Sequence, residues 1–395
     1  MNTDLEPQVR EILPAMIAFR RELHARPELS FQEYQTSRRV REELARLPGI
    51  RLLDPFIGTD VVAVLEGPQA GRCLVLRADM DALPITEQTG AAYASTTPGV
   101  MHACGHDGHT AMLLGAATVL ARTGRPLPGR VVFVFQPAEE DGGGGGRLCA
   151  RGLLESLKAD AALALHAWPN LPVGTIGIRS GEAMAANFEL GIRIRGRGSH
   201  GAYPHRGIDP VVVAAQVISA LQTIVSRNID PQDPAVVTVG CVRAGQASNV
   251  IPDTCDMSGT IRFVRPETGA RLREAVERVV RHTALAHGAE AEVTIRDSYP
   301  PMYNAPELAG LVVETGRAVL GEQAVFTDLA ISMGVEDFAF YARRVPAAMF
   351  RLGIRPPDRE SFPSLHQSDF DFNDDALATG IVMLCELARR FLERR

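Results

Sequence analysis

Residues 101–110, Met-His-Ala-Cys-Gly-His-Asp-Gly-His-Thr, place three of the ten histidines and one of the six cysteines of the chain within ten positions. Such a cluster has three interpretations: a metal site, a thiol nucleophile with a histidine base, or chance. Cys104 and His106 are two positions apart and could reach one ion or two adjacent ions, since borderline-soft divalent metals accept both thiolate and imidazole. His102 or His109 taken singly is more often a hydrogen-bonded structural histidine than a ligand.

Three short apolar runs elsewhere in the chain end in polar side chains. Runs without alternation are typical of strands that are buried on both faces of a mainly parallel sheet. Leu74–Leu76 continues into Arg77-Ala-Asp79-Met-Asp81, Val131–Phe135 into Gln136-Pro-Ala-Glu139-Glu140, and Leu163–Leu165 into His166. Ligands of such sheets bind beyond the carboxyl ends of the strands. The sequence therefore predicts that these carboxylates and the 101–110 loop converge at one edge of one sheet.

The pair Glu139-Glu140 helps to separate the interpretations. Adjacent carboxylates point in different directions, so one can bind a metal while the other faces a metal-activated water as a base. A nucleophilic Cys104 would give no reason for this pair, because thiol catalysis needs no second carboxylate. The spacing favours metal-assisted hydrolysis. His366, in Pro-Ser-Leu-His366-Gln, is isolated, and taken alone it would be a structural residue.

The elements that position these residues fall into two groups. A chain of 395 residues exceeds the size at which single cores stop growing, so we expect two domains. Residues 187–297 follow the order strand, helix, strand, strand, helix, strand, which is the ferredoxin-like α+β arrangement. Residues 1–186 and 298–395 are predicted to form one α/β domain with a mainly parallel sheet, which the smaller domain interrupts.

Helices are predicted between and after the buried strands of the larger domain. A helix over Thr110–Ala121 directly follows the cysteine-histidine loop. Beyond the smaller domain we expect a helix over about 306–319, a strand near Ala347–Leu352 and an amphipathic helix that begins near Asp375.

Composition excludes several classes of partner. The net charge of −6 is mild, and no lysine- or arginine-rich tract is present, so nucleic acid is not expected as a partner. No stretch reaches about 18 uninterrupted apolar residues, so no membrane span is predicted. The polar N-terminus and the scattered cysteines favour reduced thiols and a cytoplasmic location.

Seven motifs in order make the whole chain recognisable. They resemble the amidohydrolase branch of the aminoacylase/carboxypeptidase G superfamily of metallopeptidases, which includes hippurate hydrolases, N-acyl-amino-acid deacylases and auxin-conjugate hydrolases. The motifs are Arg77-Ala-Asp-Met-Asp-Ala-Leu-Pro84, His102-Ala-Cys-Gly-His-Asp-Gly-His109, Gln136-Pro-Ala-Glu-Glu140, Gly198-Ser-His-Gly-Ala-Tyr-Pro-His205, Ser248-Asn-Val-Ile-Pro252, Gly259-Thr-Ile-Arg262 and Gly334-Val-Glu-Asp-Phe338.

The resemblance implies a catalytic domain with two divalent metal ions; zinc, manganese, cobalt and nickel all suit its ligands. Glu139 falls on the position of the general base. The wider superfamily carries His-x-Asp where this chain has Asp79-Met-Asp81, so we suppose that a cysteine supplies the missing donor and that Asp81 orients a ligand. The positions that match metal ligands are Cys104, His106, Glu140, His166 and His366.

The smaller domain also gains a role through the resemblance. In the superfamily it is a dimerisation (lid) domain, and a histidine that matches His200 reaches the active site of the partner to stabilise the oxyanion. Asn249 and Arg262 match positions that hold the carboxylate of the substrate. A homodimer, or an oligomer built from dimers, is therefore expected. Arg262 has independent support, because alternation along its strand puts it on the polar face.

The function that follows is hydrolysis of the amide bond of an N-acyl amino acid by a metal-activated water, with Glu139 as the base. A dipeptidase or carboxypeptidase of the same superfamily is the first alternative; a dipeptidase would need an acidic group to bind a free α-amine. An inactive, metal-stabilised binding protein is the second. A closed structural metal site would not need a non-ligating Glu139 beside the ligand Glu140.

Overall fold

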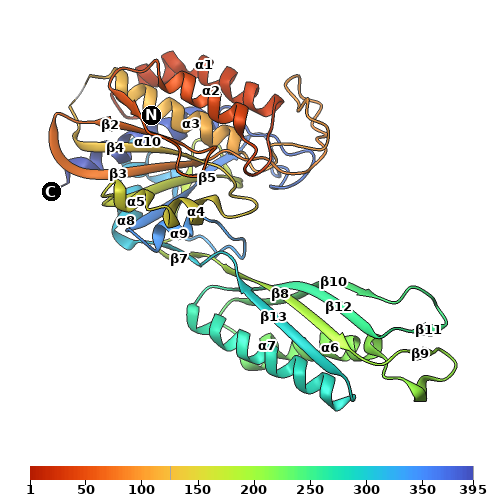
Figure 1. Ribbon diagram of the computed structural model, residues 1–395. Helices are drawn as coiled ribbons and strands as arrows, with labels where there is room; N and C mark the ends of the chain where they lie inside the picture. The colour runs from red at the N-terminus through yellow and green to blue at the C-terminus, as the bar shows by residue number, and fades with distance from the viewer. Residues whose placement is uncertain (125, 395) are drawn as a thin grey trace. The chain divides into compact units, whose positions relative to one another are not determined.

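The computed structural model describes residues 1–124 and 126–394 (Figure 1). The chain divides into two compact units. The larger unit consists of Met1–Gly181, Tyr303–Ala330 and Asp337–Arg395, and the smaller unit of Glu182–Met302 and Ile331–Glu336. The short segment Ile331–Glu336 thus packs with the smaller unit, although the chain on both sides of it belongs to the larger one. Short strands lie where the chain passes between the units, at β7 (Gly181–Met184) and β14 (Met302–Asn304).

An eight-stranded sheet organises the larger unit, in the order β1-β2-β4-β3-β5-β16-β6-β15. Its central strands are parallel, because β3 pairs in parallel with β4 and β5, and β5 with β16. The α/β fold with a mainly parallel sheet is therefore confirmed. The strands are β1 (Ile50–Leu52), β2 (Val61–Glu66), β3 (Gln69–Asp79), β4 (Pro128–Gln136), β5 (Ala161–Pro172), β6 (Ile176–Gly177), β15 (Val325–Phe326) and β16 (Ala347–Arg355).

Helices cover this sheet (Figure 1), and their apolar side chains form its core. One face packs against α3 and α10, which bury almost continuous apolar surface, and α1 packs on these two helices. The helices of the larger unit are α1 (Glu6–Ala25), α2 (Tyr34–Leu44), α3 (His106–Arg122), α4 (Gly144–Ala150), α5 (Leu153–Ser156), α8 (Pro306–Leu320), α9 (Ala339–Ala342) and α10 (Ala376–Glu393), with a 3-10 turn at Glu322–Ala324.

Two elements next to the predicted site are longer than the sequence pattern indicated. Helix α3 begins at His106 rather than Thr110, so part of the cysteine-histidine motif lies in its first turn. Gly105 precedes it with φ +87°, a left-handed conformation that glycine adopts without strain. Strand β5 continues past His166 to Pro172, because it pairs with β16 after its pairing with β3 ends at Ala164. Apolar runs alone could not reveal these extensions.

The smaller unit has the predicted ferredoxin-like order, which is confirmed. Its antiparallel sheet has the order β10-β12-β8-β13, and α6 and α7 bury their apolar sides against one face. The Asp209 side chain caps α6 by accepting a hydrogen bond from the Val211 amide at 2.9 Å. The elements are β8 (Ala186–Arg195), β9 (Ser199–His200), a 3-10 turn at Pro204–Arg206, α6 (Pro210–Asn228), β10 (Ala235–Ala244), β11 (Val250–Ile251), β12 (Thr254–Phe263), α7 (Pro266–Ala286) and β13 (Glu290–Asp297).

One helix, α6, is long and apolar enough to pass a test of length and composition for a membrane span. The core helices of water-soluble proteins pass the same test. Val213, Val217, Leu221 and Ile224 of this helix pack in the core of the smaller unit, and 33% of its apolar window is buried.

A buried carboxylate, Glu33, holds the loop that follows β4. Its Oε1 accepts hydrogen bonds from the Phe31 and Ala138 amides at 3.0 and 2.9 Å, and its Oε2 accepts one from the Thr59 hydroxyl at 2.9 Å. Phe31 and Ala138 are both left-handed, with φ +61° and +57°. That conformation costs a non-glycine residue about 1–2 kcal/mol. The hydrogen bonds to Glu33 offset this strain and fix the direction in which the chain leaves Ala138.

Glu33 should also give stability a dependence on pH. Burial raises the pKa of its carboxyl from an ordinary value of 4.5 to about 7. Between these two pH values the folded state keeps a proton on Glu33 that the unfolded state has lost. The folded state is therefore stabilised most at low pH, and it loses this stabilisation as the pH rises to about 7. Glu33→Gln cannot ionise but keeps an accepting oxygen. Relative to the parent, this variant should gain free energy of unfolding between pH 5 and pH 8, measured by denaturant titration of metal-free protein.

Glu28 offers a matched control. It accepts hydrogen bonds from the Gln35 and Thr36 amides and from the Thr36 hydroxyl at the start of α2, but it is only half-buried. Glu28→Gln should keep the parent's loss of stability over the same pH interval. If Glu33→Gln keeps it as well, Glu33 does not titrate as its burial implies.

Candidate metal centre

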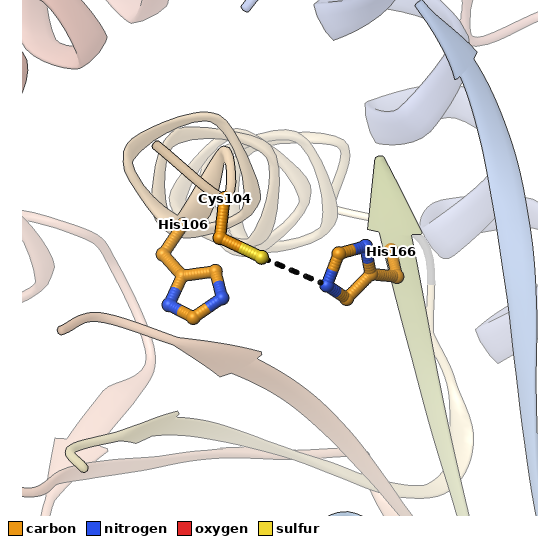
Figure 2. Close-up of side chains that lie close together, drawn as sticks. All are labelled: Cys104, His106 and His166. Atoms are coloured by element: carbon orange, nitrogen blue, oxygen red, sulfur yellow. Dashed lines mark hydrogen bonds between the residues drawn. The ribbon is translucent and has the colours of Figure 1, made fainter. Parts of the chain in front are cut away.

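The predicted convergence takes place at the carboxyl ends of the central strands. The motif that contains Cys104 and His106 lies at the start of α3, and His166 lies on β5 just beyond its pairing with β3. Figure 2 shows the three side chains pointing toward one another. The Cys104 Sγ lies 3.5 Å from the His166 Nε2, and all three residues are buried. Their donor atoms lie within 4.8 Å of one another, a spacing that a metal ion could bridge.

The carboxylate and imidazole that complete the predicted ligand set lie beside this group. The Glu140 Oε1 is 3.2 Å from the His366 Nε2 and 3.9 Å from the His106 Nε2. Cys104, Glu140 and His366 form a second group whose donor atoms lie within 4.8 Å of one another. The His366 side chain is 52% exposed, so this end of the cluster is open to solvent. The structure thus brings all five predicted ligand residues together.

The tautomers of the two buried histidines fit metal binding. The His106 Nδ1 lies 2.9 Å from the Asp81 backbone oxygen, and the His166 Nδ1 lies 2.8 Å from the Ala167 oxygen. If each Nδ1 donates its proton there, each Nε2 is left with a lone pair that points into the cluster. The His106 Nε2 is buried and has no hydrogen-bond partner among the described residues. A buried ring nitrogen without a partner suits a metal ion, which would take the place of the proton on it.

The other two histidines of the motif behave differently. The His109 Nδ1 is 2.6 Å from an Asp79 oxygen, and its Nε2 accepts a hydrogen bond from the Ala167 amide at 2.8 Å. Both nitrogens are occupied, so His109 is a structural residue. His102 is buried, and neither of its ring nitrogens has a hydrogen-bond partner in the described part of the chain. It belongs to none of the groups that could hold an ion.

Electrostatics argue against a thiol nucleophile. Burial raises the pKa of Cys104 well above its usual value, and the Glu140, Glu139 and Asp79 carboxylates raise it further. Without a cation the thiol stays protonated, and the thiol form is a poor nucleophile. Burial alone would lower the pKa of His106, but Asp79 and Asp81 outweigh it and raise this pKa to about 10. This excess of negative charge would be balanced by divalent ions.

Glu139 and Glu140 diverge as expected for adjacent carboxylates, and Asp81 holds both of them. The two Asp81 oxygens accept hydrogen bonds from the Glu139 and Glu140 amides, each at 3.0 Å. The Glu139 side chain is buried and accepts a hydrogen bond from the Asp337 amide at 3.3 Å, whereas Glu140 points to His366. His106, Glu139 and Glu140 still have donor atoms within 4.8 Å of one another. Glu139 can therefore face the same ions without being required as a ligand.

At Asp79 the resemblance implied that a usual histidine ligand is missing, and the Asp79 carboxylate is bound to other residues. One oxygen is 2.6 Å from the His109 Nδ1, and the other forms an ion pair with Arg77 at 2.6 Å. Arg77 also pairs with Asp337 at 2.8 Å, and all of these groups are buried. Asp337 could have been found from the sequence, because it lies in the recognised Gly334–Phe338 motif.

The predicted residues of the smaller unit form two separate features within it. His200 on β9 pairs with Val250 on β11, and the Gly201 amide donates a hydrogen bond to the Asn249 backbone oxygen at 2.7 Å. His200 and Asn249 therefore lie near each other, and both are exposed. Arg262 lies on β12, where alternation leaves it on the polar face, as predicted. It donates hydrogen bonds to the Thr260 hydroxyl at 3.2 Å and to the Met333 backbone oxygen at 3.3 Å. Burial lowers the pKa of Arg262, and no described carboxylate forms an ion pair with it.

Glu33 was missed by the sequence reasoning. It is a single glutamate in a polar stretch, and its partner Ala138 lies 105 positions further along the chain. No local pattern marks such a contact.

Comparisons with known proteins agree with this geometry. The model of peptidase family M20/M25/M40 matches residues 75–390. N-acetyl-L-cysteine deacetylase of Bacillus subtilis is 38% identical over 96% of this chain and 88% of its own length. N-acetyldiaminopimelate deacetylase of a Geobacillus species is 36% identical over 93% and 96%. The crystal structure of Bacillus subtilis YXEP, described as a dinuclear metal binding peptidase from the M20 family, is 35% identical, covers 98% of this chain and 100% of its own, and has a TM-score of 0.85.

A family match over most of the chain, full-length relatives and a cluster of potential metal ligands all lead to one conclusion. The chain belongs to peptidase family M20/M25/M40, and it is a metal-dependent amidohydrolase.

Proposed function

We propose that the protein hydrolyses the amide bond of N-acyl amino acids and releases a carboxylic acid and a free amino acid. The observation that carries this proposal is the cluster of potential ligands with the additional carboxylate of Glu139 beside it. A site that only bound metal would have no use for that carboxylate. Relatives named as deacetylases of N-acetylated amino acids support the substrate class.

Two divalent ions per chain are proposed, held by the five residues of the cluster, Cys104, His106, Glu140, His166 and His366. Zinc, manganese, cobalt and nickel all suit this mixture of thiolate, imidazole and carboxylate. When bound, such ions act as Lewis acids and make a water molecule acidic enough to attack an amide at neutral pH. Asp81 keeps His106 and both glutamates in place through its hydrogen bonds.

Glu139 is proposed as the general base. It takes a proton from the attacking water and later returns it to the amine that leaves. Its position supports this role, because it is buried beside His106 and Glu140 while its backbone is held by Asp81.

Asn249 and Arg262 are proposed to bind the α-carboxylate of the substrate. A guanidinium can grip a carboxylate with two parallel hydrogen bonds. Arg262 is half-buried, and it has no carboxylate partner in the described part of the chain. Its positive charge is thus available to an anionic ligand.

His200 is proposed to stabilise the oxyanion in the active site of a partner subunit, within a homodimer that forms through the smaller unit. Its exposure on β9 fits a residue that acts outside its own chain. All six cysteines are free, which fits the reducing cytoplasm that we propose as the location.

The first test is Glu139→Gln. This change keeps the shape of the side chain but removes the base, so turnover should fall by about 10²–10⁴-fold. Elemental analysis should still find close to two ions per chain, because the ligand cluster remains intact. If the variant loses metal but keeps its turnover per bound ion, the roles of Glu139 and Glu140 are exchanged.

The substrate class is tested through Arg262. A hydrogen bond between charged groups contributes roughly 1.5–3 kcal/mol, which corresponds to about ten- to a hundredfold in rate. The parent should therefore prefer an N-acyl amino acid over its carboxamide, and Arg262→Ala should lose most of this preference. Arg262→Lys keeps the charge but not the planar fork, so its loss should be smaller. Unchanged discrimination by Arg262→Ala would remove the carboxylate contact from the proposal.

The shared active site is tested by mixing two inactive variants, His200→Ala and Glu139→Gln. After subunit exchange, one site of each mixed dimer combines an intact Glu139 with an intact His200 from the partner. Part of the activity should return. Mass spectrometry of differently labelled chains measures the exchange, and no recovery despite complete exchange would contradict the role of His200 in a partner.

A further inference from the structure

A single arginine interrupts an apolar strand next to the metal-binding cluster. Strand β16 reads Ala-Ala-Met-Phe-Arg351-Leu-Gly-Ile-Arg, and Arg351 is the only charged residue before its last position. Its neighbours in the strand are buried, whereas Arg351 itself is half-buried. A charge in the middle of a sheet needs either a structural partner or a ligand.

Strand register puts Arg351 beside His166. In the parallel pairing of β16 with β5, Arg351 is opposite His166 and Gly353 is opposite Trp168. Side chains alternate between the faces of a strand, so Arg351, His166 and Trp168 share one face. Phe350 and Leu352 point into the core on the other face. The guanidinium therefore lies on the side of the sheet that carries a proposed metal ligand.

Trp168 holds the guanidinium in this position. The central carbon of the Arg351 guanidinium lies 4.1 Å from the centre of the Trp168 ring, and that ring lies 6.2 Å from the His166 ring, nearly perpendicular to it. Arg351 donates one hydrogen bond, to the Ala330 backbone oxygen at 3.2 Å. A guanidinium has five N–H donors in a rigid plane, so most of its donors remain available.

No described carboxylate balances the charge of Arg351. None forms an ion pair with it, and the other charge that acts on it is the positive one of Arg179. Burial and Arg179 lower the pKa of Arg351 to about 10, so it remains a cation at neutral pH. Arg179 donates a hydrogen bond to the Leu329 oxygen at 2.8 Å and therefore also lies near this end of the sheet. The half-buried guanidinium of Arg351 thus has no described counter-charge, and an anion bound beside it would supply one.

We infer that Arg351, stacked on Trp168 and placed one strand away from His166, binds a second carboxylate of the substrate. This inference rests on the proposed function and narrows it to N-acyl amino acids with two carboxylates. The α-carboxylate is assigned to Arg262, so the second one is either at the end of a dicarboxylic acyl group or in the side chain of an acidic amino acid. Both sources present the same group to Arg351.

The test uses two pairs of substrates that differ only in one charge. N-succinyl-alanine is compared with its terminal amide, and N-acetylglutamate with N-acetylglutamine. In one of the pairs the parent should prefer the dicarboxylate by about tenfold or more in kcat/KM, the size expected for a hydrogen bond between charged groups. Arg351→Gln should lose that preference while hydrolysing the neutral member at a similar rate, and Arg351→Lys should retain part of it.

Arg72 provides a matched control. Its guanidinium stacks on Phe391 at 3.7 Å and donates to the Phe391 backbone oxygen at 3.5 Å, but it lies near the amino end of β3, far along the strand from Asp79. Arg72→Gln should keep the preference of the parent. If Arg351→Gln does not fold, Arg351→Lys gives the answer, because it keeps the cation but not the planar fork and should lose part of the preference.

Other outcomes would contradict the second carboxylate site. Hydrolysis of neutral N-acyl amino acids with no preference in either pair would overturn the second carboxylate site and leave the proposed function intact. A dicarboxylate preference that survives in Arg351→Gln would also overturn the second carboxylate site. So would a loss, in Arg351→Gln, of the discrimination against the α-carboxamide, because Arg351 would then bind the α-carboxylate instead. No hydrolysis of any N-acyl amino acid would overturn the site together with the proposed function.

Discussion

The arrangement of the metal-binding cluster depends on the buried carboxylate of Asp81. Its two oxygens accept the amides of Glu139 and Glu140, one oxygen also accepts the Ser30 hydroxyl at 2.8 Å, and the His106 Nδ1 lies 3.3 Å from the other. These partners come from the N-terminal region, the loop after β4 and the first turn of α3. One side chain thus joins three segments that are far apart in the sequence. Hydrogen bonds to the ionised form lower the pKa of Asp81 against the effect of burial, so it remains an acceptor.

Two further buried carboxylates, those of Glu33 and Asp79, support the residues around Asp81. Glu33 fixes Ala138 in a left-handed conformation directly before the two glutamates, and Asp79 connects His109 to Arg77. Arg77 brings a permanent positive charge into this part of the core, where it pairs with Asp79 and Asp337. The remaining negative charge is concentrated around Cys104, His106 and Glu140. The excess of negative charge and the spacing of the potential ligands therefore both indicate a cation site at this cluster.

Much of this fold could be predicted because its signals are local. The buried strands are continuous apolar runs, and the helix over about 306–319 and the strand near Ala347 were found close to where α8 and β16 lie. The cluster was predicted from residue types at strand ends and from the family resemblance, which was needed for His366. The extension of β5 depends on its second partner, and the contact of Glu33 with Ala138 joins distant segments. Arg351 lies within an apolar run, and no sequence motif marks it. Only the register of β16 with β5 shows that it lies beside His166.

The insertion of the smaller unit has a consequence for the order of folding during synthesis. All the strands of its four-stranded sheet lie between Ala186 and Asp297, so this sheet can form as soon as that stretch has been made. The eight-stranded sheet cannot close at that time, because β16 fits between β5 and β6 and is made near the end of the chain. Until then β5 has an unpaired edge, and unpaired strand edges make partly made chains prone to aggregate. The four-stranded sheet of the interrupting unit can thus form before the strands of the interrupted unit have all been made.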